Sequence, residues 1–176
     1  MKKNILIFGL LSGLIASSML IVSAVQCYNN KDFSGNMVMG FTLMILAFSF
    51  IFVGVKNYRD KFNQGVISFG KAFKIGIFIA FIASSIYVVT WLIAYYGFIP
   101  DFMDKYAAHV IDQAKAAGKT TVEINKQIAE MEDYKEMYKS PIGVILLTYM
   151  EILPVGIVIT LLSALILKRK QTTAIV

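Results

Sequence analysis

Four long apolar runs, separated by polar and charged connections, dominate the pattern of this chain. They cover residues 5–25, 37–55, 75–99 and 142–167, and the only charged residue within them is Glu151. A helix rises about 1.5 Å per residue and a bilayer core is about 30 Å thick, so roughly 20 apolar residues are enough to cross it. Because lipid offers no hydrogen-bond partner to a backbone, the runs must be helices. The pattern predicts an all-α, polytopic membrane protein with four transmembrane helices.

Composition supports this prediction. Hydrophobic residues make up 57% of the 176 residues, and the mean hydropathy is +0.68. A soluble chain of this length has too little polar material to wrap four apolar helices. We therefore expect residues 1–176 to form a single four-helix membrane domain.

The first run has features of a signal peptide, since Lys2 and Lys3 precede it and Val22-Ser23-Ala24 resembles a cleavage site. The apolar region of a secretory signal is usually about 7–15 residues, however, and this run is longer. We interpret it as a retained membrane helix.

The Lys and Arg residues alternate between the two sides of the predicted membrane. Ten of them lie in the N-terminus, the 56–74 connection and the C-terminal tail, against seven in the longer segments 26–36 and 100–141. Cytoplasmic loops carry the excess of Lys and Arg, so both termini should be cytoplasmic. The net charge of +6 is mostly this topological signal and does not indicate nucleic-acid binding.

Several residues at the predicted boundaries are candidate membrane anchors. Lys71 and Lys74 can lay their apolar stems along the cytoplasmic interface, next to Arg59, and keep their charges in water. Trp91 lies near the outer boundary, where amphipathic rings prefer to be, although a tryptophan at this place can equally pack between helices. Membrane lipid is thus the first expected partner.

The long connection, residues 100–141, is predicted to form an extracytoplasmic helical hairpin between the third and fourth spans. Phe102, Tyr106 and Val110 lie on one helical stripe, and Gly118 is a natural stop. Thr120 with Glu123 three residues later matches a capping box, which starts a second helix. Such a hairpin can cover the bundle or present a surface to a partner.

The third helix is predicted to begin before its apolar run. Gly65 marks a turn, Ser68 can cap a helix start, and Phe69 follows it on an apolar stripe.

Glu151 is the sharpest candidate for chemistry. It lies about ten residues into the fourth span, hence about 15 Å deep and near the middle of the bilayer. A carboxyl group there must be protonated, paired or exposed to water. Hydroxyl groups at a similar depth come from Ser17, Ser18, Tyr87 and Thr90. The set is a candidate proton-binding or cation-binding site, or else a structural hydrogen bond between helices.

Two further patterns concern helix packing. Pro154 removes a backbone donor from the fourth helix and favours a kink. Gly9-x-x-x-Gly13 and Ala80-x-x-x-Ser84 allow close helix contact, either within one chain or between two copies.

The sequence lacks the motifs of enzymes. It has no nucleophile elbow, no zinc-binding helix pair and no phosphate-cradling glycine loop. His109 is the only histidine and Cys27 the only cysteine, which makes a poor metal site and excludes an intramolecular disulfide. We predict no enzymatic activity and no cofactor.

Residues 58–76 carry a family resemblance. They read Tyr-Arg-Asp-Lys-Phe-Asn-Gln-Gly-Val-Ile-Ser-Phe-Gly-Lys-Ala-Phe-Lys-Ile-Gly, and the match continues through Ile99-Pro100-Asp101-Phe102 to the end of the fourth span. The chain resembles the bacterial membrane proteins grouped as the domain of unknown function family numbered 4199. The resemblance implies a four-helix inner-membrane protein with a long outer loop, and it brings no activity or site residues.

Two hypotheses for function follow. The first is a non-enzymatic interaction or accessory subunit that binds another membrane protein through the outer hairpin and the basic inner loop. The second is a small proton-coupled transporter or channel component, necessarily a homo-oligomer or part of a larger complex, that uses Glu151.

Overall fold

The chain folds into a bundle of four long helices with a shorter helical hairpin across one end. The computed structural model describes residues 1–30 and 37–169, and within them the regular structure is helical. The helices are α1 (Lys2–Asn30), α2 (Met37–Phe62), α3 (Phe69–Gly97), α4 (Phe102–Ala116), α5 (Thr121–Tyr138) and α6 (Pro141–Leu167). Part of the predicted 26–36 connection and Lys170, one of the basic residues counted in the C-terminal tail, lie outside the described residues.

The four predicted spans are confirmed as the cores of α1, α2, α3 and α6. Each of these helices is long and apolar enough to cross a membrane. Large apolar side chains cover their outward faces, for example Leu14, Val89 and Ile166, which are exposed. This is the arrangement expected of helices that face lipid, and the protein is a four-span membrane protein.

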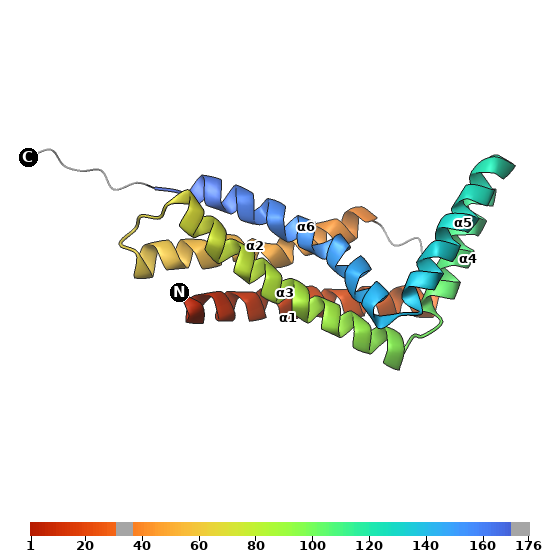
Figure 1. The fold of residues 1–176 in the computed structure, drawn as a ribbon, viewed down its shortest axis with the longest axis horizontal. Coiled ribbons are helices and arrows are strands. Elements are labelled where there is room, and N and C mark those ends of the chain that lie inside the picture. Colours follow the sequence, from red (N-terminus) through yellow and green to blue (C-terminus); the bar gives the residue numbers. More distant parts are fainter. Residues whose placement is uncertain (31–36, 170–176) are drawn as a thin grey trace, which may run out of the picture.

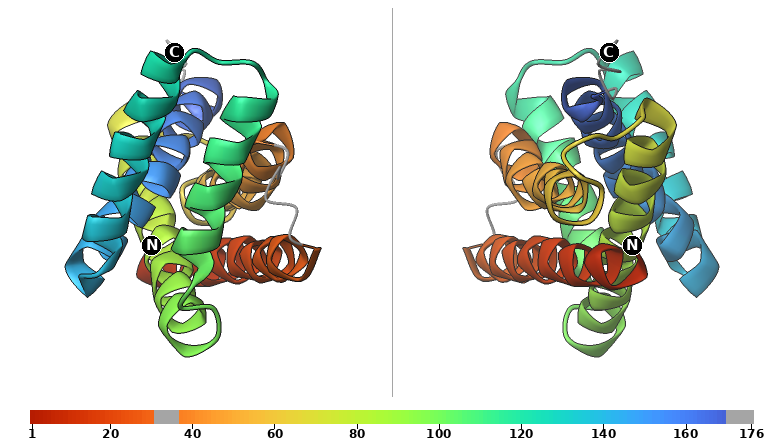
Figure 2. Two further views of the ribbon diagram at one scale, coloured as in Figure 1. Left: turned by 90° about the vertical axis from the view of Figure 1, so that its right-hand side faces the viewer. Right: turned by 90° about the vertical axis from the view of Figure 1, so that its left-hand side faces the viewer.

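The two ends of the bundle differ in what closes them (Figure 1). The first residues, the α2–α3 connection and the C-terminal end of α6 lie together, and we call this the termini end. The α4–α5 hairpin lies at the other end, which we call the hairpin end. Figure 2 shows the hairpin crossing that end of the bundle.

Glycines set the closest helix contacts. A Cβ atom added to Gly9 would lie 2.8 Å from Ile82, and one added to Gly13 would lie 2.6 Å from Ile86. From the first contact to the second, the residue numbers rise by four on α1 and by four on α3. The two helices therefore run parallel and meet through the Gly9-x-x-x-Gly13 face. The predicted small-residue contact is therefore made within one chain.

The α3–α6 contact uses small residues in the same way. A Cβ atom on Gly156 would lie 3.0 Å from Ala80, and one on Gly76 would lie 2.7 Å from Thr160. Along this contact the residue numbers rise on α3 as they fall on α6, so the two helices are antiparallel. Ser85 and Tyr149 continue this alignment with a hydrogen bond of 2.8 Å between their hydroxyl groups.

Local signals for the other helices are confirmed. The Thr120 and Glu123 pair forms both bonds of a capping box at the start of α5, and Gly118 has a positive φ of 70° between α4 and α5. Ser68 accepts a hydrogen bond from the Lys71 backbone at the start of α3. The predicted stripe on α4, which also includes Ala114, is confirmed in part: Ala114 is buried and Phe102 and Val110 pack against the core, but Tyr106 is exposed, and Met103 and Ala107 are buried beside the stripe. Small and flexible side chains at those two places let α4 approach α5 closely.

Candidate functional site

Glu151 lies on α6 at the level of the middle of α3. The neighbouring Thr148 and Ile152 are buried, with 3% and 0% of their surfaces exposed, and Ile152 belongs to the core. One residue turns a helix by about 100°, so Glu151 points to the side of that buried face. Its side chain is exposed, and no hydrogen bond or ion pair joins it to another of the residues that the structure describes.

The charge of Glu151 acts on tyrosines of three other helices. These are Tyr87 of α3, Tyr106 of α4 and Tyr138 of α5. Burial raises the pKa of Tyr138 to about 12, while a hydrogen bond with Trp91 lowers it and the Glu151 carboxylate raises it. Burial also raises the pKa of Tyr106, with Tyr134 and Glu151 as smaller causes. The acid of α6 is thus electrostatically coupled to phenol groups of α3 and of the hairpin.

The predicted hydroxyl partners of Glu151 have different environments. Tyr87 and Ser17 are buried, each with 5% of its surface exposed, and the Ser17 hydroxyl has no hydrogen-bond partner among the described residues. The α1–α3 pairing of Gly9 with Ile82 and Gly13 with Ile86, continued by one turn, brings Ser17 to the level of Thr90. Ser18 instead donates to the Leu14 carbonyl of its own helix at 2.8 Å. None of these groups bonds to Glu151 in the described part of the chain.

Pro154 lies inside α6 and is exposed on the same side of the helix as Glu151. A proline has no backbone N–H, so the carbonyl of Met150, four residues earlier, lacks its helical donor. Met150 is itself 72% exposed. A carboxyl group and a carbonyl group without a helical partner therefore lie close together on the surface of α6.

The base of the hairpin is held by an aromatic cluster that sequence analysis did not predict as a unit. Trp91 is buried, and its ring contacts Phe102 edge-on with centroids 5.2 Å apart. Tyr95 contacts Tyr138 in the same manner at 5.1 Å. The burial of Trp91 places it between helices, which is the second of the two roles considered for it.

A polar contact supplements this cluster. Tyr28 of α1 donates a hydrogen bond of 2.8 Å to Asp101, and the Lys105 ammonium lies 2.8 Å from the same carboxylate. The Lys105 ammonium also lies over the Tyr28 ring, 3.8 Å from its centroid. The bonds from Lys105 and from Tyr28 hold the pKa of Asp101 below its ordinary value. The end of α1 is thereby tied to the start of α4.

A groove of about 240 Å³ lies beside this cluster, lined by Tyr95 and by charged residues of α4 and α5. Four of its five charged residues are paired, because Lys135 lies 2.9 Å from Asp104 and Lys139 lies 2.5 Å from Glu136. No group of three or more His, Cys, Asp or Glu side chains is gathered to hold a metal ion within residues 1–30 and 37–169.

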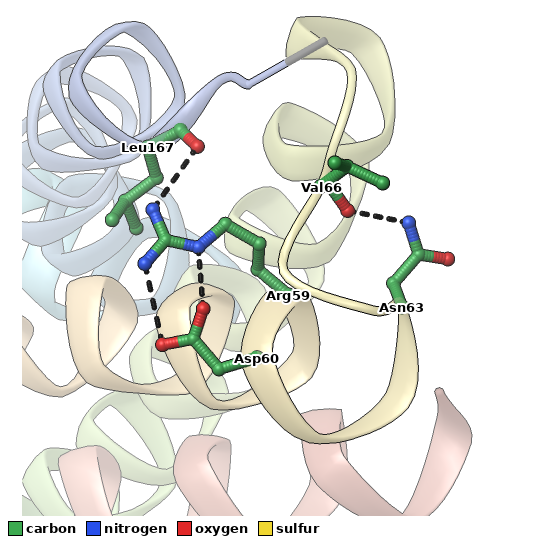
Figure 3. A network of polar contacts seen from close by, with 5 residues as sticks. All are labelled: Arg59, Asp60, Asn63, Val66 and Leu167. Atoms are coloured by element: carbon green, nitrogen blue, oxygen red, sulfur yellow. Dashed lines mark hydrogen bonds and ion pairs between the residues drawn. The ribbon is translucent and has the colours of Figure 1, made fainter. Parts of the chain in front are cut away.

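The termini end is closed by polar contacts (Figure 3). Arg59 donates to the Leu167 carbonyl at the end of α6 at 3.4 Å, and it also forms an ion pair of 2.6 Å with Asp60. Ile67 and Arg169 exchange two backbone hydrogen bonds, of 3.0 and 2.8 Å. We call this arrangement of Arg59, Ile67, Leu167 and Arg169 the loop–tail clasp.

The rest of the α2–α3 connection supports the clasp. Asn63 donates to the Val66 carbonyl at 2.5 Å and accepts a bond of 2.9 Å from Lys71. The Lys71 ammonium also lies 5.2 Å from the centroid of the Tyr58 ring. Lys71 is therefore occupied within the protein, whereas Lys74 is exposed. Of the predicted anchors at this end, Arg59 and Lys71 hold the connection, and Lys74 is free to meet the membrane surface.

The model of one protein family matches residues 7–169 of the chain, and its description is "Protein of unknown function (DUF4199)". The chain belongs to this family. Among curated proteins and among solved structures, no match to the chain is found.

Residues 58–76, which carried the resemblance in the sequence, build the α2–α3 connection. They supply Arg59, Asn63 and Ile67 to the clasp and its support. In this DUF4199 member they join α2, α3 and the end of α6.

Proposed function

We propose that the protein is a non-enzymatic accessory subunit of the cytoplasmic membrane. Both termini would be cytoplasmic, and the α4–α5 hairpin would lie outside as the contact surface for another membrane protein. The single observation that carries the proposal is a folded, anchored hairpin with a polar, exposed outer face.

The distribution of basic residues supports this orientation. Lys56, Lys61, Lys74 and Lys168 are exposed at the termini end. The hairpin connection has six Lys residues against eight Asp and Glu residues. An excess of Lys and Arg marks the cytoplasmic side of a membrane protein, which supports a cytoplasmic termini end.

The hairpin has the properties of a presented surface. Its base is fixed to the bundle by the Trp91–Phe102 and Tyr95–Tyr138 ring contacts. Its far end is exposed, and Val122 there has 79% of its surface uncovered. Rigid attachment lowers the entropy cost of binding a partner, because the hairpin loses little freedom when it binds.

The absence of enzyme motifs from the sequence is the basis for proposing a non-enzymatic role. The charged groups of the hairpin pair with one another, as Lys135 does with Asp104. Paired charges of this kind contribute to the stability and solubility of the hairpin, and they are poorly suited to chemistry on a substrate.

Copurification in mild detergent tests the proposal. The tagged protein is isolated from its native membrane, and the mass of the intact complex is measured. A foreign protein in fixed stoichiometry that is lost in Val122→Asp is the expected result. Lys74→Gln, at the opposite end, is the control and should retain that protein. A complex that contains only copies of this chain would contradict the accessory role.

A second function, a small oligomeric proton-coupled transporter or channel component, is favoured by one observation. Glu151 is an exposed acid within the fourth span, and its charge acts on Tyr87, Tyr106 and Tyr138. Proton flux into liposomes that contain the purified protein tests this function. Flux that is abolished by Glu151→Gln and retained in Val122→Asp would favour the transporter over the accessory subunit.

A further inference from the structure

One strip on the outer surface of α6 is unlike the other lipid-facing surfaces. It consists of Met150, Glu151, Pro154 and Val158, which are exposed on one side of the helix. Met150, Pro154 and Val158 are spaced four residues apart, and Glu151 follows Met150 directly. Met150 and Val158 are 72% and 54% exposed. Their apolar surfaces suit lipid, but the residue between them is a carboxylic acid. We call these four residues the α6 strip.

The strip presents two hydrogen-bond acceptors that lack a donor. The Glu151 carboxylate has no ion pair or hydrogen bond with the described residues. The Met150 carbonyl lacks its helical donor because Pro154 has no N–H. Both groups are costly in hydrocarbon when they have no partner. A cationic donor placed against the strip would satisfy both.

The chain itself cannot supply that cation. Its four apolar runs contain no Lys, Arg or His, so a second copy of the protein offers only another Glu151 at this depth. Two carboxylates facing each other repel, whereas a Lys or Arg side chain is the complementary group.

We propose that the α6 strip is the docking face for a transmembrane helix of another protein, and that this helix carries Lys or Arg near the middle of its span. The proposal rests on the accessory role proposed above and gives the chemistry of the partner. The hairpin would contact the partner outside the membrane, and Glu151 would contact it within the membrane.

A peptide experiment tests the chemistry directly. The full-length protein, labelled with a donor dye, is reconstituted in neutral liposomes with an acceptor-labelled, leucine-rich transmembrane peptide that has one central Lys. A matched peptide has Leu at that position. We expect energy transfer to show about tenfold tighter association with the Lys peptide, the ratio that one buried polar pair supplies in a membrane. Glu151→Gln should remove the preference, and Asp104→Asn, which changes a carboxyl group of the hairpin, should retain it.

Three results would overturn the proposal. The first is equal association of both peptides with the native protein, and the second is an unchanged preference in Glu151→Gln. The third is a homodimer of the native protein that Glu151→Gln disrupts, since a second copy would then cover the strip. If Glu151→Gln does not fold, Val158→Trp replaces it, because a bulky ring on the strip should block both peptides.

This test separates the proposal from the accessory role. A stoichiometric foreign partner that copurifies equally well with native protein and with Glu151→Gln would leave the accessory role in place and reject the α6 strip. A preference for the Lys peptide without any partner in native membranes would support the strip and reject the accessory role.

Discussion

At the termini end, backbone groups of the α2–α3 connection and of Arg169, just after α6, bond to one another. Arg59 also donates a hydrogen bond to the Leu167 carbonyl. At the hairpin end, the contacts that join the elements are mainly between aromatic rings, with Trp91 and Tyr95 packed against Phe102 and Tyr138. Polar contacts demand particular atoms at particular distances, whereas ring packing tolerates changes of partner. The termini end should therefore depend more strictly on its exact residues than the hairpin end does.

The largest effect should come from removing the centre of the aromatic cluster. Trp91→Ala leaves a cavity beneath the hairpin, and we expect it to lower the free energy of unfolding by about 3 kcal/mol. Unfolding in mixed detergent, followed by circular dichroism, measures the loss. Trp91→Phe, which keeps a ring, should cost clearly less. Equal losses for the two variants would show that ring packing does not hold this end.

Arg59→Ala should weaken the loop–tail clasp by about 1 kcal/mol, since it removes one charge-assisted bond at a partly exposed site. The backbone amides of Ile67 and Arg169 should then exchange with solvent faster, while amides of α4 and α5 keep their native rates. Arg59→Lys is the control and should recover part of the protection. Faster exchange in the hairpin would mean that the two ends are coupled.

Thr120→Ala tests whether the hairpin depends on its own local signals as well as on the cluster. The variant loses the capping box, and we expect a cost of about 0.5 kcal/mol, confined to the first turn of α5. Amide exchange at Glu123 and Ile124 reports it. Thr121→Ala, one residue later and outside the capping box, should leave those rates unchanged.

The smallest effect concerns the polar contact at the hairpin base. The pKa of Asp101 in the folded protein lies below its unfolded value of about 3.9, so the contact contributes fully above that pH and is lost as the pH falls through the folded pKa. Carboxyl carbon NMR shifts of Asp101 across pH 2–6 measure this titration. Tyr28→Phe should move the Asp101 midpoint upward, and an unmoved midpoint would show that Tyr28 does not stabilise the carboxylate.

Sequence alone predicts those parts of the molecule that depend on neighbouring residues. The four spans follow from run length, and the Thr120–Glu123 cap and the Ser68 cap follow from residue type and spacing. The depth of Glu151 follows in the same way, because it depends only on its place in the fourth run.

The rest depends on contacts between distant segments. Arg59 and Leu167 are separated by 108 residues, and no local pattern connects them. Glu151 acts electrostatically on Tyr106 and Tyr138 because of how the hairpin is placed on the bundle, which the apolar pattern of α4 and α5 does not determine. The sequence does place Tyr87 and Ser17 near the depth of Glu151, but it cannot predict that Ser18 turns back to its own helix.

The loop–tail clasp also bears on how the protein is made. The α2–α3 connection precedes its partners in the chain, with 108 residues between Arg59 and Leu167. Ile67 can form its two backbone bonds with Arg169 only after the fourth span has been synthesised. Until then its amide and carbonyl groups lack these partners, so the first half of the protein is made before the contacts that close its own connection exist.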